Sequence, residues 1–206
     1  MNFPKITKKY AQVQCNGEDA YESYIMIIKI LKHCPEPLVI LELGCGLGRG
    51  SILMNQRLTY PPKFYLLDGD TCTRGQVSGL NRDSNDDFYN SLEATKVFCE
   101  ANGLSDFVLL NAEKDWRRDL PKFDLVFSVL SIGFHWPVSL YLDAVYSHLL
   151  DEAKLIFQMR LTTDKDPVLM EWVDWNYEQV KSVPLDKYKL ISVDFGNNPL
   201  LVLEKR

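Results

Sequence analysis

The chain of 206 residues predicts an α/β fold, built on one doubly wound sheet of seven strands that is mostly parallel and ends in an antiparallel hairpin. Short, almost wholly apolar runs recur along the sequence, as is typical of strands buried on both faces of a parallel sheet. A glycine-rich turn joins the first of these runs to a helix. The last two strands are so close in sequence that they must be antiparallel.

The glycine-rich turn follows the apolar run at residues 39–43 and leads into a helix start near Ser51. Bare backbone in such a turn can approach a nucleotide-like ligand closely. A dinucleotide fingerprint is excluded because Arg49 stands where its third glycine belongs, and no Walker A Gly-Lys-Ser/Thr follows. The turn and the acid before it are made of Glu42, Gly44, Gly46 and Gly48.

This Glu-x-Gly-x-Gly-x-Gly pattern resembles the first motif of the class I S-adenosylmethionine-dependent methyltransferases, which have a Rossmann-like sheet. The resemblance implies S-adenosyl-L-methionine as cofactor, with the glycine loop beneath its methionine part and Glu42 orienting the loop and the amino group. It covers about residues 38–205, so we expect a methyltransferase domain at 38–206 after an N-terminal helical lid segment at 1–37. A helix is predicted from Glu18 to His33 in that segment. Tyr10 or Tyr21 could touch ligand there, although packing is the interpretation we favour.

The second strand is predicted at Phe64–Asp68, and its final acid comes twenty residues after Gly48. A carboxylate at this strand end can accept both hydroxyls of a ribose. The resemblance implies that role for Asp68, with Asp70 as the competitor, and Gly69 is assigned to the same site. The polar stretch at 69–87 is either a flap, with Arg74 and Arg82 facing an anionic group, or has no function. Helical spacing resumes at Phe88–Phe98 and ends at Gly103.

The third strand is predicted at Phe107–Leu110, followed by Asn111 and Ala112. The family usually has Asp-Ala here, where the acid accepts from the exocyclic amine of adenine and the next backbone N–H meets the ring. Asn111 departs from the pattern, but its amide oxygen can accept the same hydrogen bond. We therefore assign the adenine contacts to Asn111 and to the backbone of Ala112. Trp116 either covers the adenine edge or packs elsewhere.

The fourth strand is predicted at Phe123–Leu130, and Ser128 near its end is assigned to the cofactor site. Ligands of doubly wound sheets gather beyond the carboxyl ends of strands, so residues 131–137 should face the transferable methyl group. His135 lies between two aromatic residues there and suits a general base; the other interpretation is that it bonds a loop carbonyl. His33 and His148 are expected on helices, in structural roles.

Four elements complete the prediction. A helix is indicated by residues from Tyr141 to Leu149, and a fifth strand by Leu155–Met159. An aromatic-rich helix is expected at Val168–Ser182. Strands at Tyr188–Phe195 and Leu200–Glu204, joined by a tight turn, form the antiparallel hairpin that is also the sheet signature of the family.

Composition narrows the function further. A net charge of −5 argues against binding duplex nucleic acid through many phosphates. Five cysteines without close pairing favour a reducing cytoplasm and predict no metal site. No signal peptide or apolar run long enough to span a membrane is present.

The DNA amino-methylating, cytosine carbon-5, protein arginine and magnesium-dependent catechol motifs are all absent. We therefore predict methyl transfer to a hydroxyl or amine of a small molecule, such as a sugar or other metabolite, with His135 as base. The alternative from another class is a cofactor-binding module without its own catalysis, acting as a regulatory partner subunit. The oligomeric state and the identity of the acceptor stay open.

Overall fold

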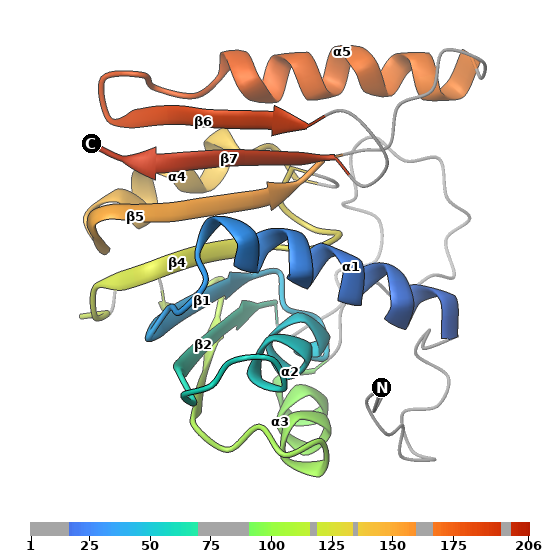
Figure 1. Cartoon of the computed structure of the whole chain (residues 1–206), viewed down its shortest axis with the longest axis vertical. Coiled ribbons are helices and arrows are strands. Elements are labelled where there is room, and N and C mark those ends of the chain that lie inside the picture. Colours follow the sequence, from blue (N-terminus) through green and yellow to red (C-terminus); the bar gives the residue numbers. More distant parts are fainter. Residues whose placement is uncertain (1–16, 70–90, 116–118, 134–135, 160–166, 195–198) are drawn as a thin grey trace.

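A computed structural model describes residues 17–69, 91–115, 119–133, 136–159, 167–194 and 199–206. It confirms the predicted fold class: one seven-stranded sheet in the order β3-β2-β1-β4-β5-β7-β6, in which only β7 runs against the others (Figure 1). The strands are β1 (Val39–Leu43), β2 (Lys63–Asp68), β3 (Phe107–Asn111), β4 (Phe123–Ser128), β5 (Leu149–Gln158), β6 (Tyr188–Asp194) and β7 (Leu200–Lys205).

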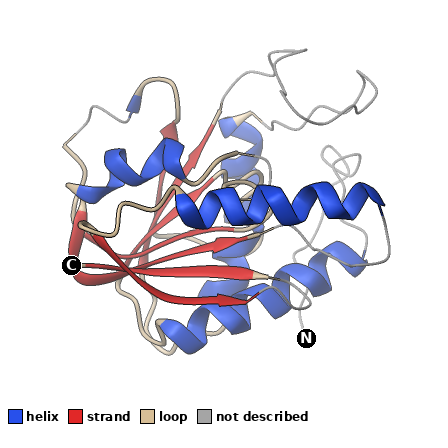
Figure 2. Cartoon of the chain, turned by 90° about the horizontal axis from the view of Figure 1, so that it is seen from above, coloured by secondary structure: helices blue, strands red, loops and turns tan. Residues whose placement is uncertain are grey.

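Helices cover both faces of this sheet (Figures 1 and 2). One face packs against α1 (Gly17–His33), α2 (Arg49–Asn55) and α3 (Leu92–Ala101) in a continuous apolar core. The other face packs against α4 (Ser139–Tyr146), with α5 (Pro167–Lys181) joining this core through Val180. Buried Ile40 and Leu41 show why the strands are apolar throughout, because successive side chains of β1 enter opposite cores.

The order in which the strands are added to the sheet reverses between β1 and β4. From β1 the chain proceeds to β2 and β3 on one side, then returns to place β4 on the other side of β1. Parallel strands point their carboxyl ends to one edge, and a crevice forms at that edge where the strand order reverses. The loops after β1, β2, β3 and β4 therefore meet at a single place.

Several predicted boundaries were wrong. The fifth strand begins at Leu149 rather than Leu155 and ends at Gln158. The fourth strand ends at Ser128 rather than Leu130, because Leu130 has a φ of 58° and cannot continue an extended strand. The helix after the loop ends at Tyr146, so His148 lies in a turn and not on a helix. There its N–H donates to the Val145 carbonyl and its own carbonyl accepts from Phe123 N–H, which starts β5 at Leu149.

The hairpin strands were predicted correctly, but residues 195–198 of its turn lie outside the described residues, as does Phe88. Within the described ranges, no helix combines the length and apolar character needed to cross a membrane.

Candidate cofactor and acceptor site

The glycine loop is hydrogen-bonded to the end of β2 and packs against the loop after β4. The N–H groups of Gly44 and Cys45 donate to the Leu67 carbonyl at 2.8 and 3.1 Å. Gly44 has a φ of 65°, and a Cβ on it would lie 1.9 Å from the Ser131 hydroxyl oxygen. Only glycine satisfies both the left-handed backbone and this contact. The loop after β4 therefore packs directly on the loop after β1.

Asp68 ends β2 beneath this loop and is 8% exposed. Its Oδ2 accepts from Gly46 N–H at 2.5 Å, and its Oδ1 accepts from Gly69 N–H at 2.7 Å. Burial raises the pKa of Asp68 to about 6, although the two backbone N–H groups act in the opposite direction. Each carboxylate oxygen keeps a second lone pair, so the group can hold the glycine loop and still accept a ligand hydroxyl.

Glu42 lies deeper, in β1, and is 2% exposed. Its Oε2 accepts from the Ser51 hydroxyl at 2.5 Å and from Ser51 N–H at 3.1 Å, in the first turn of α2. Its Oε1 lies 2.4 Å from the place that a Cβ on Gly50 would take. Burial, the largest cause, raises the pKa of Glu42 to about 7, while the Ser51 hydrogen bonds lower it. Glu42 thus holds the loop–helix junction from below.

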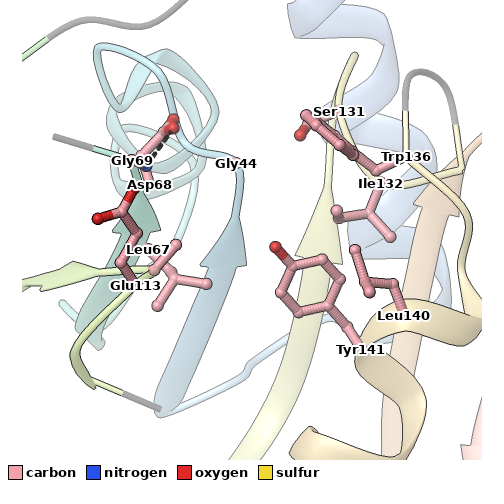
Figure 3. A pocket seen from close by; sticks show the side chains of 11 residues that line it. Gly44, Leu67, Asp68, Gly69, Glu113, Ser131, Ile132, Trp136, Leu140 and Tyr141 are labelled. Atoms are coloured by element: carbon pink, nitrogen blue, oxygen red, sulfur yellow. Dashed lines mark hydrogen bonds between the residues drawn. The ribbon is translucent and has the colours of Figure 1, made fainter. Parts of the chain in front are cut away.

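A cavity of about 220 Å³ opens at the carboxyl ends of β1, β2 and β4. Figure 3 shows Leu67 and Asp68 on one side of it, and Ile132 and Tyr141 on the other. The Tyr141 ring directs its hydroxyl into the space between them; burial and then the nearby negative charge of Asp68 raise its pKa. The walls comprise Gly44, Leu67, Asp68, Gly69, Ala112, Glu113, Ser131, Ile132, Trp136, Leu140 and Tyr141.

The loop after β4 is strained and held from several directions. Leu130 keeps its left-handed backbone, which costs about 1–2 kcal/mol for a non-glycine residue, while its N–H donates to Gln158 Oε1. Ser128 accepts from Ile132 N–H and donates to the Leu43 carbonyl. Strain maintained in this way is typical of functional loops.

Helix α5 braces the same loop from outside the sheet. The Trp175 indole N–H donates to the Gly133 carbonyl at 2.9 Å, and the buried Gln179 Oε1 accepts from Val138 N–H at 2.7 Å, just before α4. No local sequence pattern indicated these two contacts, because they join residues about forty positions apart.

The turn after β3 is held by a hydrogen bond within the turn and by another to the end of β2. Asn111 Oδ1 accepts from Glu113 N–H at 2.9 Å, which is typical of an Asx turn. The Ala112 N–H donates to the Asp68 carbonyl at 2.8 Å and so ties the ends of β2 and β3 together. A contact from this N–H to an adenine ring would have to replace that hydrogen bond.

Of the residues assigned from sequence to the cofactor, Gly44, Asp68, Gly69 and Ala112 line the cavity. The other assigned residues do not line it: Glu42, Gly46, Gly48, Asn111 and Ser128. His135, the predicted base, lies outside the described residues, as do Asp70, Arg74, Arg82, Trp116 and Tyr10.

The segment after β4 supplies Ser131, Ile132 and Trp136 to the cavity, in agreement with its expected place. Tyr141 was expected only to pack on the sheet; its position in the first turn of the helix after a strand-end loop was the available signal.

Strand order, the single antiparallel strand and the glycine loop at the β1–β4 crevice define the Rossmann-like methyltransferase fold. A SAM-dependent methyltransferase from Aquifex aeolicus is similar over 98% of this chain and 98% of its own, with 14% identity and a TM-score of 0.64. An O-methyltransferase from Bacillus cereus in complex with S-adenosylhomocysteine is similar over 95% of this chain and 84% of its own, with 12% identity and a TM-score of 0.52.

A ribosomal protein L11 methylase from Lactobacillus delbrueckii subsp. bulgaricus matches over 94% of this chain and 81% of its own, with 14% identity and a TM-score of 0.56. No protein-family model and no curated protein sequence matches the chain. At these identities the likeness establishes the fold. The three neighbours are methyltransferases, one named for oxygen as the methylated atom and one for a ribosomal protein as substrate.

Proposed function

We propose that this protein is an S-adenosylmethionine-dependent methyltransferase that modifies a hydroxyl or amine of a small molecule. The observation that carries the proposal is Asp68, a buried carboxylate that bonds the glycine loop through Gly46 and also lines the cavity. A carboxylate in that place suits the two hydroxyls of a ribose, and the cavity extends from it both toward β1 and toward the turn after β3.

The residues present fit the cofactor in a further respect. The cavity reaches Gly44 on the β1 side and Ala112 on the β3 side, so a nucleoside held at Asp68 has room in both directions. When bound, S-adenosylmethionine supplies a methyl group activated by its positive sulfur. The protein's own contribution is positioning and exclusion of water by Ile132 and Trp136.

We place the acceptor beside the cofactor, in the part of the cavity formed by the loop after β4 and the start of α4. The side chains there are mostly apolar or aromatic, which suits a flat or sugar-like face of the acceptor: Ile132, Trp136, Leu140 and Tyr141. His135 is proposed as the base that takes a proton from the acceptor, because the chain places it one residue before the cavity residue Trp136.

Two further proposals, about the N-terminal segment and the cellular compartment, accompany this function. Residues 1–37 are proposed to form the lid, and α1 within them packs its apolar side on the core that holds α2. The described Cys34, Cys45 and Cys99 carry free thiols, which supports a reducing compartment such as the cytoplasm.

Calorimetry with S-adenosylmethionine and S-adenosylhomocysteine tests the proposal, followed by a metabolite screen for methyl transfer. Wild type should bind both, and Asp68→Ala should weaken binding by about 1–3 kcal/mol because ribose hydroxyls lose their acceptor. Asp106→Ala, an exposed carboxylate before β3, is the matched control and should bind as wild type does. Absence of binding by wild type would refute the proposal. Binding with transfer only after a second protein is added would favour the regulatory module.

A further inference from the structure

Tyr141 brings a hydroxyl group into the middle of the cavity. It belongs to the first turn of α4, and Figure 3 shows its hydroxyl in the space between the end of β2 and the loop after β4. Just before the helix, Val138 N–H donates to Gln179 Oε1 at 2.7 Å. Within the helix, the Leu142 carbonyl accepts from the Tyr188 hydroxyl at 2.6 Å. The position of the Tyr141 hydroxyl is therefore fixed by a helix that is anchored on both sides of it.

The charged groups of the cavity wall are negative. Among the described residues that line it, Asp68 and Glu113 carry carboxylates, and none is a lysine, an arginine or a histidine. Burial and then the negative charge of Asp68 raise the pKa of Tyr141, so the hydroxyl stays neutral and the field of Asp68 reaches it. A cation inside the cavity is therefore favoured over a neutral group of the same size.

The proposed cofactor would bring a cation of its own into this space. With the ribose at Asp68 and the adenine toward Ala112, the rest of the cavity extends toward Gly44, opposite the loop after β4 and the start of α4. The methylated sulfur belongs in that part, because it joins the ribose to the amino-acid arm. A sulfonium has no N–H or O–H to donate, so negative charge and oxygen lone pairs are what recognise it. A tyrosine hydroxyl can turn its lone pairs toward such a cation and remain neutral.

We propose that Tyr141 is a specificity-determining residue that recognises the positive sulfur of the methyl donor. The inference rests on the proposed function and deepens it: the cavity should hold S-adenosylmethionine more tightly than S-adenosylhomocysteine, whose sulfur is neutral. Both compounds have the same nucleoside and the same amino-acid arm, so contacts to those parts cancel in the comparison. Tyr141 and Asp68 lose their attraction for the sulfur once it is neutral, and this change favours release of the product.

The test is isothermal titration of three compounds into wild type, Tyr141→Phe and Tyr146→Phe. The compounds are S-adenosylmethionine, S-adenosylhomocysteine and sinefungin, which carries a protonated amine in place of the methylated sulfur. Wild type should bind both cations more tightly than the neutral thioether. Tyr141→Phe keeps the ring and removes only the oxygen, so it should weaken both cations roughly 5- to 30-fold and leave S-adenosylhomocysteine within about twofold. Tyr146→Phe is the matched control on the same helix and should change none of the three affinities, because Tyr146 packs edge-to-face against Tyr188 and does not line the cavity.

Tyr141→Met removes the same oxygen and gives the same comparison if the phenylalanine variant does not fold. Equal weakening of all three compounds, or no weakening of the two cations, would overturn the assignment and leave Tyr141 a packing residue. If wild type binds none of the three compounds, the proposed function itself fails. If wild type binds them without preferring the cations, the function stands and this inference does not.

Discussion

Replacing Glu42 by glutamine should change how the stability of the protein depends on pH. The folded state holds the Glu42 proton more tightly than the unfolded chain, because burial raises its pKa from 4.5 to about 7. Between these values the native state binds more protons than the unfolded state. The free energy of unfolding contributed by this group therefore falls as the pH rises from 4.5 to about 7, and is constant above.

The size of the effect follows from the same shift. One unit of pKa corresponds to about 1.4 kcal/mol, so ionisation of Glu42 lowers the free energy of unfolding by about 3 kcal/mol across this interval. Glutamine has the same shape as the protonated acid, and its oxygen can still accept from Ser51. The variant should lack this part of the pH dependence altogether.

Urea unfolding of wild type and Glu42→Gln at a series of pH values measures the difference directly. Asp68, whose pKa is raised from 3.8 to about 6, contributes a similar decline at lower pH in both proteins, and subtracting one curve from the other removes most of it. Glu93→Gln, at an exposed position of α3, controls for the loss of one negative charge. A difference curve that is flat from pH 4.5 to pH 7 would refute the argument that Glu42 is buried and protonated in the native state.

Three further outcomes are expected. Asp68→Asn should abolish the loss of S-adenosylhomocysteine affinity that we expect in wild type as the pH falls below about 6, where the carboxylate is protonated; parallel titration curves would contradict this. Gly50→Ala should destabilise by about 1–3 kcal/mol in wild type, because its Cβ meets Glu42 Oε1 at 2.4 Å and Phe127 Cε2 at 3.0 Å, and should destabilise less in Glu42→Ala, where only the Phe127 contact remains; a denaturant double-mutant cycle without coupling would exclude the Glu42 contact. Gln179→Leu should cost about 1–3 kcal/mol by leaving Val138 N–H without its acceptor, and an unchanged urea midpoint would show that another group replaces it.

The strands and the glycine loop were predictable because their signals are local. An apolar run such as Phe64–Leu67 shows burial on both faces, and Asp68 marks its end by chemistry alone. The boundaries that failed depend on backbone states that sequence does not show. Leu130 adopts a left-handed φ that its side chain disfavours, so no propensity argument could have ended β4 at Ser128.

The packing contacts that require glycine at some positions could not be predicted from the sequence either. A turn requirement explains Gly48, but only the structure shows that a Cβ there would lie 2.6 Å from the Cys99 thiol of α3. Gly50 lies outside the motif, yet it leaves the space that Glu42 occupies. Packing partners that arrive from other elements cannot be inferred from spacing within one loop, and the same holds for Tyr141 in the cavity wall.

Asp68 links these contacts to ligand binding. Its carboxylate already holds Gly46 N–H, and its backbone carbonyl holds Ala112 N–H, so one residue fixes the loop after β1 and the turn after β3. A ligand hydroxyl bonded to this carboxylate adds a second kind of donor beside Gly46 N–H, and so stabilises the ionised form of Asp68. Burial favours the protonated form of Asp68, whereas hydroxyl donors favour the ionised form. Ligand binding should therefore lower the pKa of Asp68. Release of a fraction of a proton on binding near pH 6, seen as a dependence of the calorimetric heat on buffer ionisation, is the observation that this coupling requires.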